Sequence, residues 1–150
     1  LAGAYSYEQA IMVMRRLELS IDQIEQQFRR MVFNVIARNQ DDHVKNIAYL
    51  MDRRGQWQLS PAFDLTYSYQ PSGEWTSQHQ MTINAKRDNF VVEDFRHCAE
   101  AAALKKGRAA EILEEVRVAV DNWPSFAAKA KVTTTQAERI AATHRLDIQP

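Results

Sequence analysis

Eight residues from Asn39 to Asn46, with the sequence Asn-Gln-Asp-Asp-His-Val-Lys-Asn, constrain this chain more than any other stretch. Six of the eight side chains are not expected in a hydrophobic core, and none of the eight residues is the glycine or proline of an ordinary turn. Two carboxylates, an imidazole, an ammonium group and a carboxamide follow one another within six residues. Active sites need such a density of functional groups, so we interpret the run as a chemical site that the fold must hold in place.

A long apolar stripe leads into this polar run. Ser20 followed by Gln23 has the form of a capping box, and apolar residues then recur at helical spacing as far as Ile36. We therefore expect a helix of about four turns that ends near Ala37 and delivers the polar run at its carboxyl end.

A short hairpin is predicted after the polar run. Residues 47–51 and 57–59 are compatible with strands, and the sequence Asp-Arg-Arg-Gly at 52–55 between them is typical of a turn. Asp64 comes just beyond the second strand, so the hairpin could fold its carboxylate back beside the polar run.

The rest of the sequence is mostly helical. Ser6 and Gln9 form a second capping box, which opens a helix over residues 7–17, and His79 to Asn84 alternate between apolar and polar positions as in a strand with one buried face. Further helices are expected over residues 92–102, ended by Gly107; over residues 112–123, ended by Pro124; and from a capping box of Thr135 and Glu138 toward Leu146. The predicted fold is a single, mainly helical domain with small β-hairpins.

Composition excludes several classes of protein. The 19 basic and 19 acidic residues cancel, so the charge balance gives no sign of binding to nucleic acid or to an anionic membrane. No apolar run approaches the roughly 20 residues of a membrane span. The single cysteine, Cys98, cannot form an internal disulfide, and its neighbours predict a small buried thiol. We expect a cytoplasmic protein.

The spacing of three polar residues matches a phosphoryl-transfer site. Asp41 and Asn46 are five positions apart, and Asp64 follows the predicted hairpin. In protein kinases a catalytic aspartate and a metal-binding asparagine have the same separation, and a second aspartate after a hairpin holds magnesium. One carboxylate accepts a hydrogen bond from the attacking hydroxyl, while an amide and a carboxylate supply the hard oxygen ligands that Mg²⁺ prefers.

Three motifs resemble those of the HipA-type serine/threonine kinase toxins of bacterial toxin–antitoxin modules: residues 30–36, 39–46 and 59–65. The similarity covers most of the chain and implies the fold of a protein-kinase-like C-terminal lobe, the HipA-like C-terminal domain. By position it implies Asp41 as the catalytic base, Asn46 and Asp64 as ligands of Mg²⁺, and His43 and Lys45 as supporting residues of the loop. The spacing decides between the two adjacent acids, since Asp42 stands only four positions from Asn46. Ala85 stands where we expect a glycine in relatives.

The resemblance also implies substrates and partners. It predicts transfer of phosphate from ATP to a serine or threonine hydroxyl of a protein, and a helix-turn-helix antitoxin that would bring the complex to DNA indirectly. The four glycines of the chain are too far apart to form a phosphate-cradling loop, and no strand lysine pairs with a helix glutamate before the polar run. We therefore expect a nucleotide-binding lobe to precede Leu1 in a longer protein, and little kinase activity from this segment alone.

Other interpretations of the same residues stay open. The domain could be a non-catalytic, kinase-like interaction module, or a metal-dependent phosphohydrolase that activates water with the same acids. His43 could order the loop by hydrogen bonds, Lys45 could be an exposed charge, and Asp64 could cap a turn. His79, His97 and Cys98 lack the spacing of a zinc site.

Overall fold

The apolar stripe before the polar run forms the central helix of the structure, a computed structural model that describes residues 2–148. This helix, α2 (Ile21–Ile36), is capped by the Ser20 side chain, which accepts a hydrogen bond from the Gln23 backbone N–H at 3.4 Å. Phe28, Met31 and Val35 on its apolar face are fully buried. The helix packs against α1 (Tyr7–Arg16), α4 (Arg108–Asp121) and strand β2 (Trp57–Leu59). The polar run therefore begins at the carboxyl end of a helix that is buried in the core.

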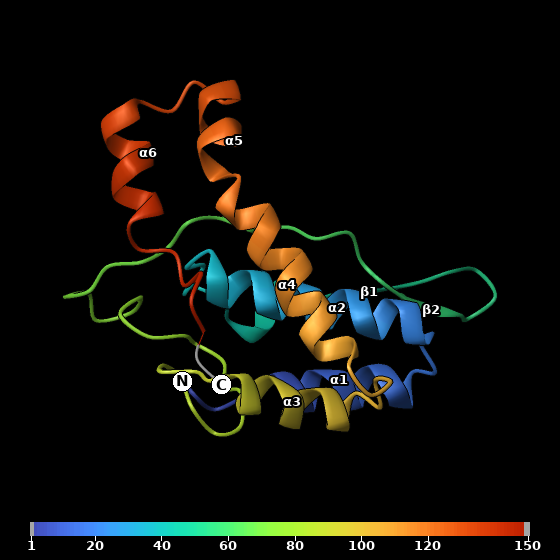
Figure 1. The fold of residues 1–150 in the computed structure, drawn as a ribbon. Coiled ribbons are helices and arrows are strands. Elements are labelled where there is room, and N and C mark those ends of the chain that lie inside the picture. Colours follow the sequence, from blue (N-terminus) through green and yellow to red (C-terminus); the bar gives the residue numbers. More distant parts are fainter. Residues whose placement is uncertain (1, 149–150) are drawn as a thin grey trace.

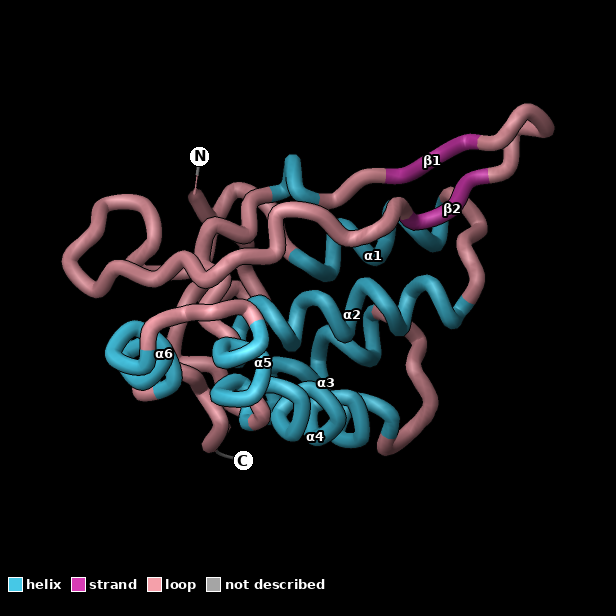
Figure 2. The backbone as a smooth tube through the Cα atoms, turned by 90° about the horizontal axis from the view of Figure 1, so that it is seen from above, coloured by secondary structure: helices cyan, strands magenta, loops and turns pink. Residues whose placement is uncertain are grey.

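The other elements surround α2. Figure 2 shows the hairpin and the long loops on one side of it and helices α3 and α4 on the other, while Figure 1 shows α5 and α6 side by side beyond the end of α4. The remaining elements are the 3₁₀ turn η1 (Val44–Asn46), β1 (Tyr49–Met51), α3 (Val92–Ala101), α5 (Trp123–Lys129) and α6 (Thr134–Ala141). The prediction of a mainly helical fold with a small β-hairpin is confirmed. Within residues 2–148, no helix is long and apolar enough to cross a membrane.

The predicted hairpin is present and is fixed to α2. Strands β1 and β2 are antiparallel, with Tyr49 opposite Leu59. The side chain of Gln23 does not complete the predicted capping box with the Ser20 backbone; its Oε1 accepts a hydrogen bond from the Leu59 N–H at 2.6 Å. One glutamine thus ties the second strand to the first turn of α2, just upstream of Asp64.

The expected strand from His79 to Asn84 has the predicted burial pattern but little strand pairing. His79, Met81 and Ile83 are buried, whereas the residues between them are half-buried. Only isolated bridges form, one of them between Ile83 and Lys86, because Asn84 (φ 48°) and Ala85 (φ 60°) turn the chain straight back. Ala85 is therefore in the left-handed region that favours glycine, the residue expected there.

The end of α3 differs from the prediction. Gly107 does not terminate this helix, which ends at Ala101 and reverses through Ala103 at φ 54°. Gly107 instead lies at the start of α4, in the left-handed region at φ 86°. The helix therefore ends within a residue of the predicted range, but Ala103 reverses the chain in place of Gly107.

The boundaries of the last two helices also shift. Pro124 lies in the first turn of α5, where a missing N–H costs no helical hydrogen bond, and α4 has already ended at Asp121. Thr133, rather than Thr135, caps α6 by accepting a hydrogen bond from the Gln136 N–H at 3.4 Å. The helix stops at Ala141, and the chain continues toward Leu146 without regular structure.

Candidate active site

The polar run begins where α2 ends. Arg38 takes a left-handed conformation (φ 60°), and the Asn39 N–H donates to the Asn34 carbonyl at 2.9 Å. A left-handed residue followed by such a hydrogen bond is a common end of a helix. The Gln40 N–H then donates to the Ser68 carbonyl at 3.0 Å. These backbone contacts hold the start of the run between α2 and a segment that lies beyond Asp64 in sequence.

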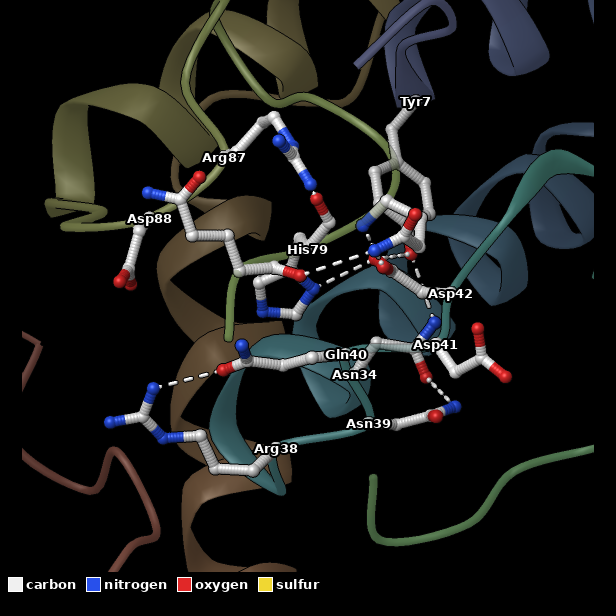
Figure 3. A network of polar contacts seen from close by, with 12 residues as sticks. Tyr7, Asn34, Arg38, Asn39, Gln40, Asp41, Asp42, His79, Arg87 and Asp88 are labelled. Carbon is white, nitrogen blue, oxygen red and sulfur yellow. Dashed lines mark hydrogen bonds and ion pairs between the residues drawn. The ribbon is translucent and has the colours of Figure 1, made fainter. Parts of the chain in front are cut away.

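Asp42 is the buried anchor of the run. One carboxylate oxygen accepts hydrogen bonds from the Tyr7 hydroxyl at 2.7 Å and from His79 Nδ1 at 2.8 Å, and the other accepts from the Gln80 N–H at 2.8 Å. Figure 3 shows Tyr7 and His79 beside the carboxylate. Asn34 donates to the Tyr7 hydroxyl at 2.9 Å, and so extends the network back to α2. Burial and the neighbouring Asp42 carboxylate raise the pKa of the Tyr7 phenol, so it donates as a neutral hydroxyl.

His79 connects Asp42 to the C-terminal segment. Its Nε2 lies 3.3 Å from Nη1 of Arg145, which can only donate, so Nε2 is the acceptor and Nδ1 carries the proton that is donated to Asp42. The Arg145 guanidinium also contacts Gln40 and Asp88. Tyr7, His79 and Arg145, which lie far apart in the sequence, therefore support the polar run on its buried side.

Asp41 lies beside this network but is not part of it. Its carboxylate is half-buried and has no hydrogen-bond partner among residues 2–148, and Figure 3 shows it pointing away from the groups around Asp42. Its backbone carbonyl accepts from the His43 N–H at 2.9 Å and from Asn46 Nδ2 at 3.2 Å. The backbone is thus fixed while the carboxylate stays available.

Asn46 brings Asp41 and Asp64 together. Besides the Asp41 carbonyl, its Nδ2 donates to Oδ2 of Asp64 at 3.0 Å. Asp64 is exposed and holds a left-handed conformation (φ 54°) that is uncommon for a residue other than glycine, and Asn39 Nδ2 approaches its backbone carbonyl at 3.4 Å. Such local strain is typical of functional positions. The hairpin therefore returns Asp64 to the polar run, as the spacing predicted.

The pair of Asn46 and Asp64 fits a magnesium ion. With Asn46 Nδ2 used as a donor, Asn46 Oδ1 and Asp64 Oδ1 have no partner among the residues that the structure describes, and both are hard oxygen ligands. Across residues 2–148, no group of three His, Cys, Asp or Glu side chains could hold a metal by itself. Mg²⁺ in phosphoryl-transfer sites usually takes one or two protein ligands and completes its shell with water and phosphate oxygens.

The two supporting residues of the run differ in their surroundings. Lys45 is exposed and makes no ion pair within the described part of the chain. His43 is half-buried, its N–H donates to the Asp41 carbonyl, and its Nδ1 is buried without a partner among residues 2–148. The Lys45 side chain is therefore exposed to solvent, whereas His43 lies against the interior of the loop.

Sequence reasoning missed the residues that support the site. Tyr7 and Arg145 carried no signal, since they lie far from the polar run in sequence and nothing in their neighbours singles them out. Asp42 was considered only as an alternative to Asp41, and His79 only as part of a strand and as a weak zinc candidate. The alternation of residues 79–84 did indicate that His79 is buried, and a buried histidine needs polar partners.

Comparison with known proteins adds one match. A sequence model of the family described as the HipA-like C-terminal domain matches residues 2–123, which include Asp41, Asn46, Asp64 and His79 but not Arg145. The curated proteins contain no match to the sequence.

Proposed function

The chain belongs to the family of HipA-like C-terminal domains, and from this premise we propose that it is the catalytic lobe of an ATP- and Mg²⁺-dependent serine/threonine protein kinase. The observation that carries the proposal is the double hydrogen bond of Asn46, which joins the Asp41 carbonyl and the Asp64 carboxylate. The Asp64 carboxylate and the Asn46 amide meet beside the backbone of Asp41, and the three residues have kinase spacing. The other acid of the run, Asp42, is held by hydrogen bonds in the core.

Each residue has a role that its surroundings allow. The Asp41 carboxylate accepts the proton of a serine or threonine hydroxyl as that oxygen forms a bond to the γ-phosphorus and the bond to the leaving ADP oxygen breaks. Asn46 Oδ1 and Asp64 would hold Mg²⁺, which neutralises charge on the phosphate oxygens when it is bound. Lys45 adds positive charge at the same edge, and His43 supports the loop that carries Asp41.

A second lobe is part of the proposal. Phosphoryl transfer from ATP needs a phosphate cradle such as a glycine-rich loop, and in kinases a strand lysine paired with a helix glutamate. The four glycines of this sequence are too far apart for such a loop, and no such lysine–glutamate pair precedes the polar run. The active protein therefore combines this lobe with a nucleotide-binding lobe, and the 150-residue segment alone turns over little or no ATP.

The biological setting follows from the family alone. In this setting the kinase is the toxin of a cytoplasmic toxin–antitoxin module, its substrate is a protein hydroxyl, and its inhibitor is a helix-turn-helix antitoxin that carries the complex to DNA.

The test uses the protein that contains this lobe together with its nucleotide-binding lobe. We expect Asp41→Asn to lower phosphate transfer to a protein acceptor by roughly 10²-fold or more while Mg²⁺-dependent nucleotide binding persists, because the base acts on the acceptor hydroxyl. Asp64→Asn should abolish the Mg²⁺-dependent part of nucleotide binding. Asp22→Asn, an exposed acid in the first turn of α2, is the matched control.

Two outcomes would contradict the proposal. Phosphate release without an acceptor and unaffected by Asp41→Asn would indicate a phosphohydrolase. Nucleotide binding that does not depend on Mg²⁺ or on Asp64 would indicate a non-catalytic interaction module.

A further inference from the structure

A small polar cavity lies behind the polar run. Its volume is about 20 Å³, and it is lined by Tyr7, by residues of α2 and of the polar run, and by Ile47, Ala62, Phe63 and Leu65. Neither Asp41 nor Asp64 lines it, but Asn46, a proposed ligand of Mg²⁺, does. The cavity therefore lies next to the proposed metal site and shares Asn46 with it.

Several residues that line this cavity carry unpaired polar atoms. Five buried side-chain N or O atoms lack a partner among residues 2–148, and four of them belong to residues that line the cavity: Gln27 Oε1, Arg30 Nε, Asn39 Oδ1 and His43 Nδ1. A buried polar atom without a partner destabilises the fold. A ligand in the cavity would give these four atoms partners.

The chemistry of the four atoms identifies the ligand. Gln27 Oε1 and Asn39 Oδ1 are acceptors; the orientation of the Asn39 amide is set by its Nδ2, which donates to Asn34 Oδ1 at 3.0 Å. Arg30 Nε–H is a donor on a charged guanidinium, which disfavours a cation, while two amide oxygens disfavour an anion. A neutral molecule that donates two hydrogen bonds and accepts two fits, and a cavity needs only roughly 10–15 Å³ to hold one water.

We propose that this cavity binds a single water molecule, which joins α2 to the polar run and holds His43 in its Nδ1–H tautomer. The tautomer follows from the number of hydrogen-bond donors and acceptors around the water. Both water hydrogens go to Gln27 and Asn39, and Arg30 donates to the water oxygen, so the remaining contact requires His43 Nδ1 to donate as well. Nε2 of His43 is then left without a proton and can act only as an acceptor.

This inference does not depend on kinase activity. It concerns how the loop that carries Asp41 is supported, since the His43 backbone N–H also donates to the Asp41 carbonyl. The water would fix both the position and the protonated nitrogen of the residue two places after the proposed base.

A crystal structure of the 150-residue chain, at a resolution that shows ordered waters, tests the site directly. We expect one peak in the cavity within hydrogen-bonding distance of the four atoms. A cavity without a peak, or one closed by side chains that pair with each other, would overturn the proposal, and so would a heavier ion with anomalous signal.

Nitrogen NMR of the histidine rings tests the tautomer independently. At about pH 8, where ordinary histidines are neutral, His43 should show a protonated Nδ1 and an unprotonated Nε2. Gln27→Leu removes one acceptor and frees a water hydrogen for Nδ1, so the population should shift toward the Nε2–H form. Gln26→Leu changes the exposed neighbour on the same helix and should leave the His43 signals unchanged.

A predominantly Nε2–H form of His43 in the unmodified protein would contradict the inference. An equal response of His43 to Gln27→Leu and to Gln26→Leu would contradict it as well.

Discussion

Asp41 and Asp42 are adjacent in sequence and have opposite environments. Asp42 is fully buried and satisfied by three donors, whereas Asp41 keeps its carboxylate outside that network. A carboxylate that is buried among three donors cannot contact a substrate hydroxyl. The division of roles between two identical side chains is therefore made by their surroundings.

This difference predicts that the same substitution has a large effect on stability at Asp42 and a small one at Asp41. Asp42→Asn replaces an acceptor-only group by one that presents an N–H₂ to Tyr7, His79 or Gln80, so we expect a loss of about 3 kcal/mol in the free energy of unfolding. Asp41→Asn should change it by less than about 0.5 kcal/mol. Urea unfolding of the 150-residue chain measures both. Equal stabilities of the two variants would show that the buried network does not support the fold.

The residues of the candidate site were easier to predict from the sequence than the buried residues that hold them in place. The five-residue interval from Asp41 to Asn46 and the hairpin before Asp64 are local patterns, so they can be read from spacing. The contacts of Asp42 with Tyr7 and His79 join residues 35 and 37 positions apart, and nothing in a local pattern specifies them. The choice of Asp41 over Asp42 was made from spacing, without the burial that explains it.

At the level of elements, the tight turn at Asn84 and Ala85 is fastened to helix α3. Asp94 in the first turn of α3 accepts hydrogen bonds from Asn84 Nδ2 at 2.8 Å, from Lys86 Nζ at 2.9 Å and from the Val91 N–H at 2.9 Å. Burial raises the pKa of the Asp94 carboxyl, but the hydrogen bonds from Val91, Lys86 and Asn84 outweigh it, and the net pKa is lowered. The turn follows His79, so Asp94 also stabilises the segment that reaches Asp42.

Asp94 should make part of the stability depend on pH. Because its pKa is lower in the folded than in the unfolded chain, its ionised form stabilises the fold above the unfolded value of about 3.9, and this contribution is lost as the pH falls through the folded value. We expect Asp94→Asn to be less stable by about 2 kcal/mol at neutral pH, with the difference shrinking below about pH 4. Urea unfolding across this range measures the effect.

Glu93→Gln is the control for this prediction, because its exposed pair with Arg96 should contribute less than about 1 kcal/mol at neutral pH. A difference between the unmodified protein and Asp94→Asn that stays constant down to strongly acidic pH would contradict the assignment.

The elements themselves were predictable where periodicity and capping agree. The helices that follow Ser6 and Ser20 have both signals, and their bounds lie within a residue of the predicted ones. The residue predicted to terminate α3, Gly107, was wrong because Ala103 takes a left-handed conformation without being glycine. The predicted start of α6 was wrong because three threonines in succession, 133–135, offer alternative caps. Residue type alone does not decide which of several neighbouring residues caps or ends a helix.

For the whole molecule, the segment after α6 returns to the end of α2 and packs against the buried side of the polar run. The Arg145 N–H donates to the Ile36 carbonyl at 2.9 Å, and its guanidinium contacts Gln40, His79 and Asp88. In Figure 1 this red segment passes beside the carboxyl end of α2. Residues 2–123 match the family, so this closing contact comes from a part of the chain outside the match.

Arg145 therefore contributes to the stability of the entire domain. Burial and the nearby Arg38 lower the pKa of its guanidinium to about 10, and it is still charged at neutral pH. Arg145→Gln removes that charge and several of its donors from His79, Gln40 and Asp88, so we expect a loss of about 2–3 kcal/mol, or roughly 4–10 °C in Tm. The amide of Gln40, at the start of the polar run, should also exchange faster with solvent.

Arg139→Gln on the exposed face of α6 is the matched control, since Arg139 makes no ion pair within residues 2–148. It should shift the free energy of unfolding by less than about 0.5 kcal/mol. If both arginine variants unfold at the same urea concentration and show the same exchange at Gln40, the C-terminal segment does not contribute to the stability of the domain. If Arg145→Gln alone loosens Gln40, a residue 105 positions away in sequence holds the loop that carries Asp41.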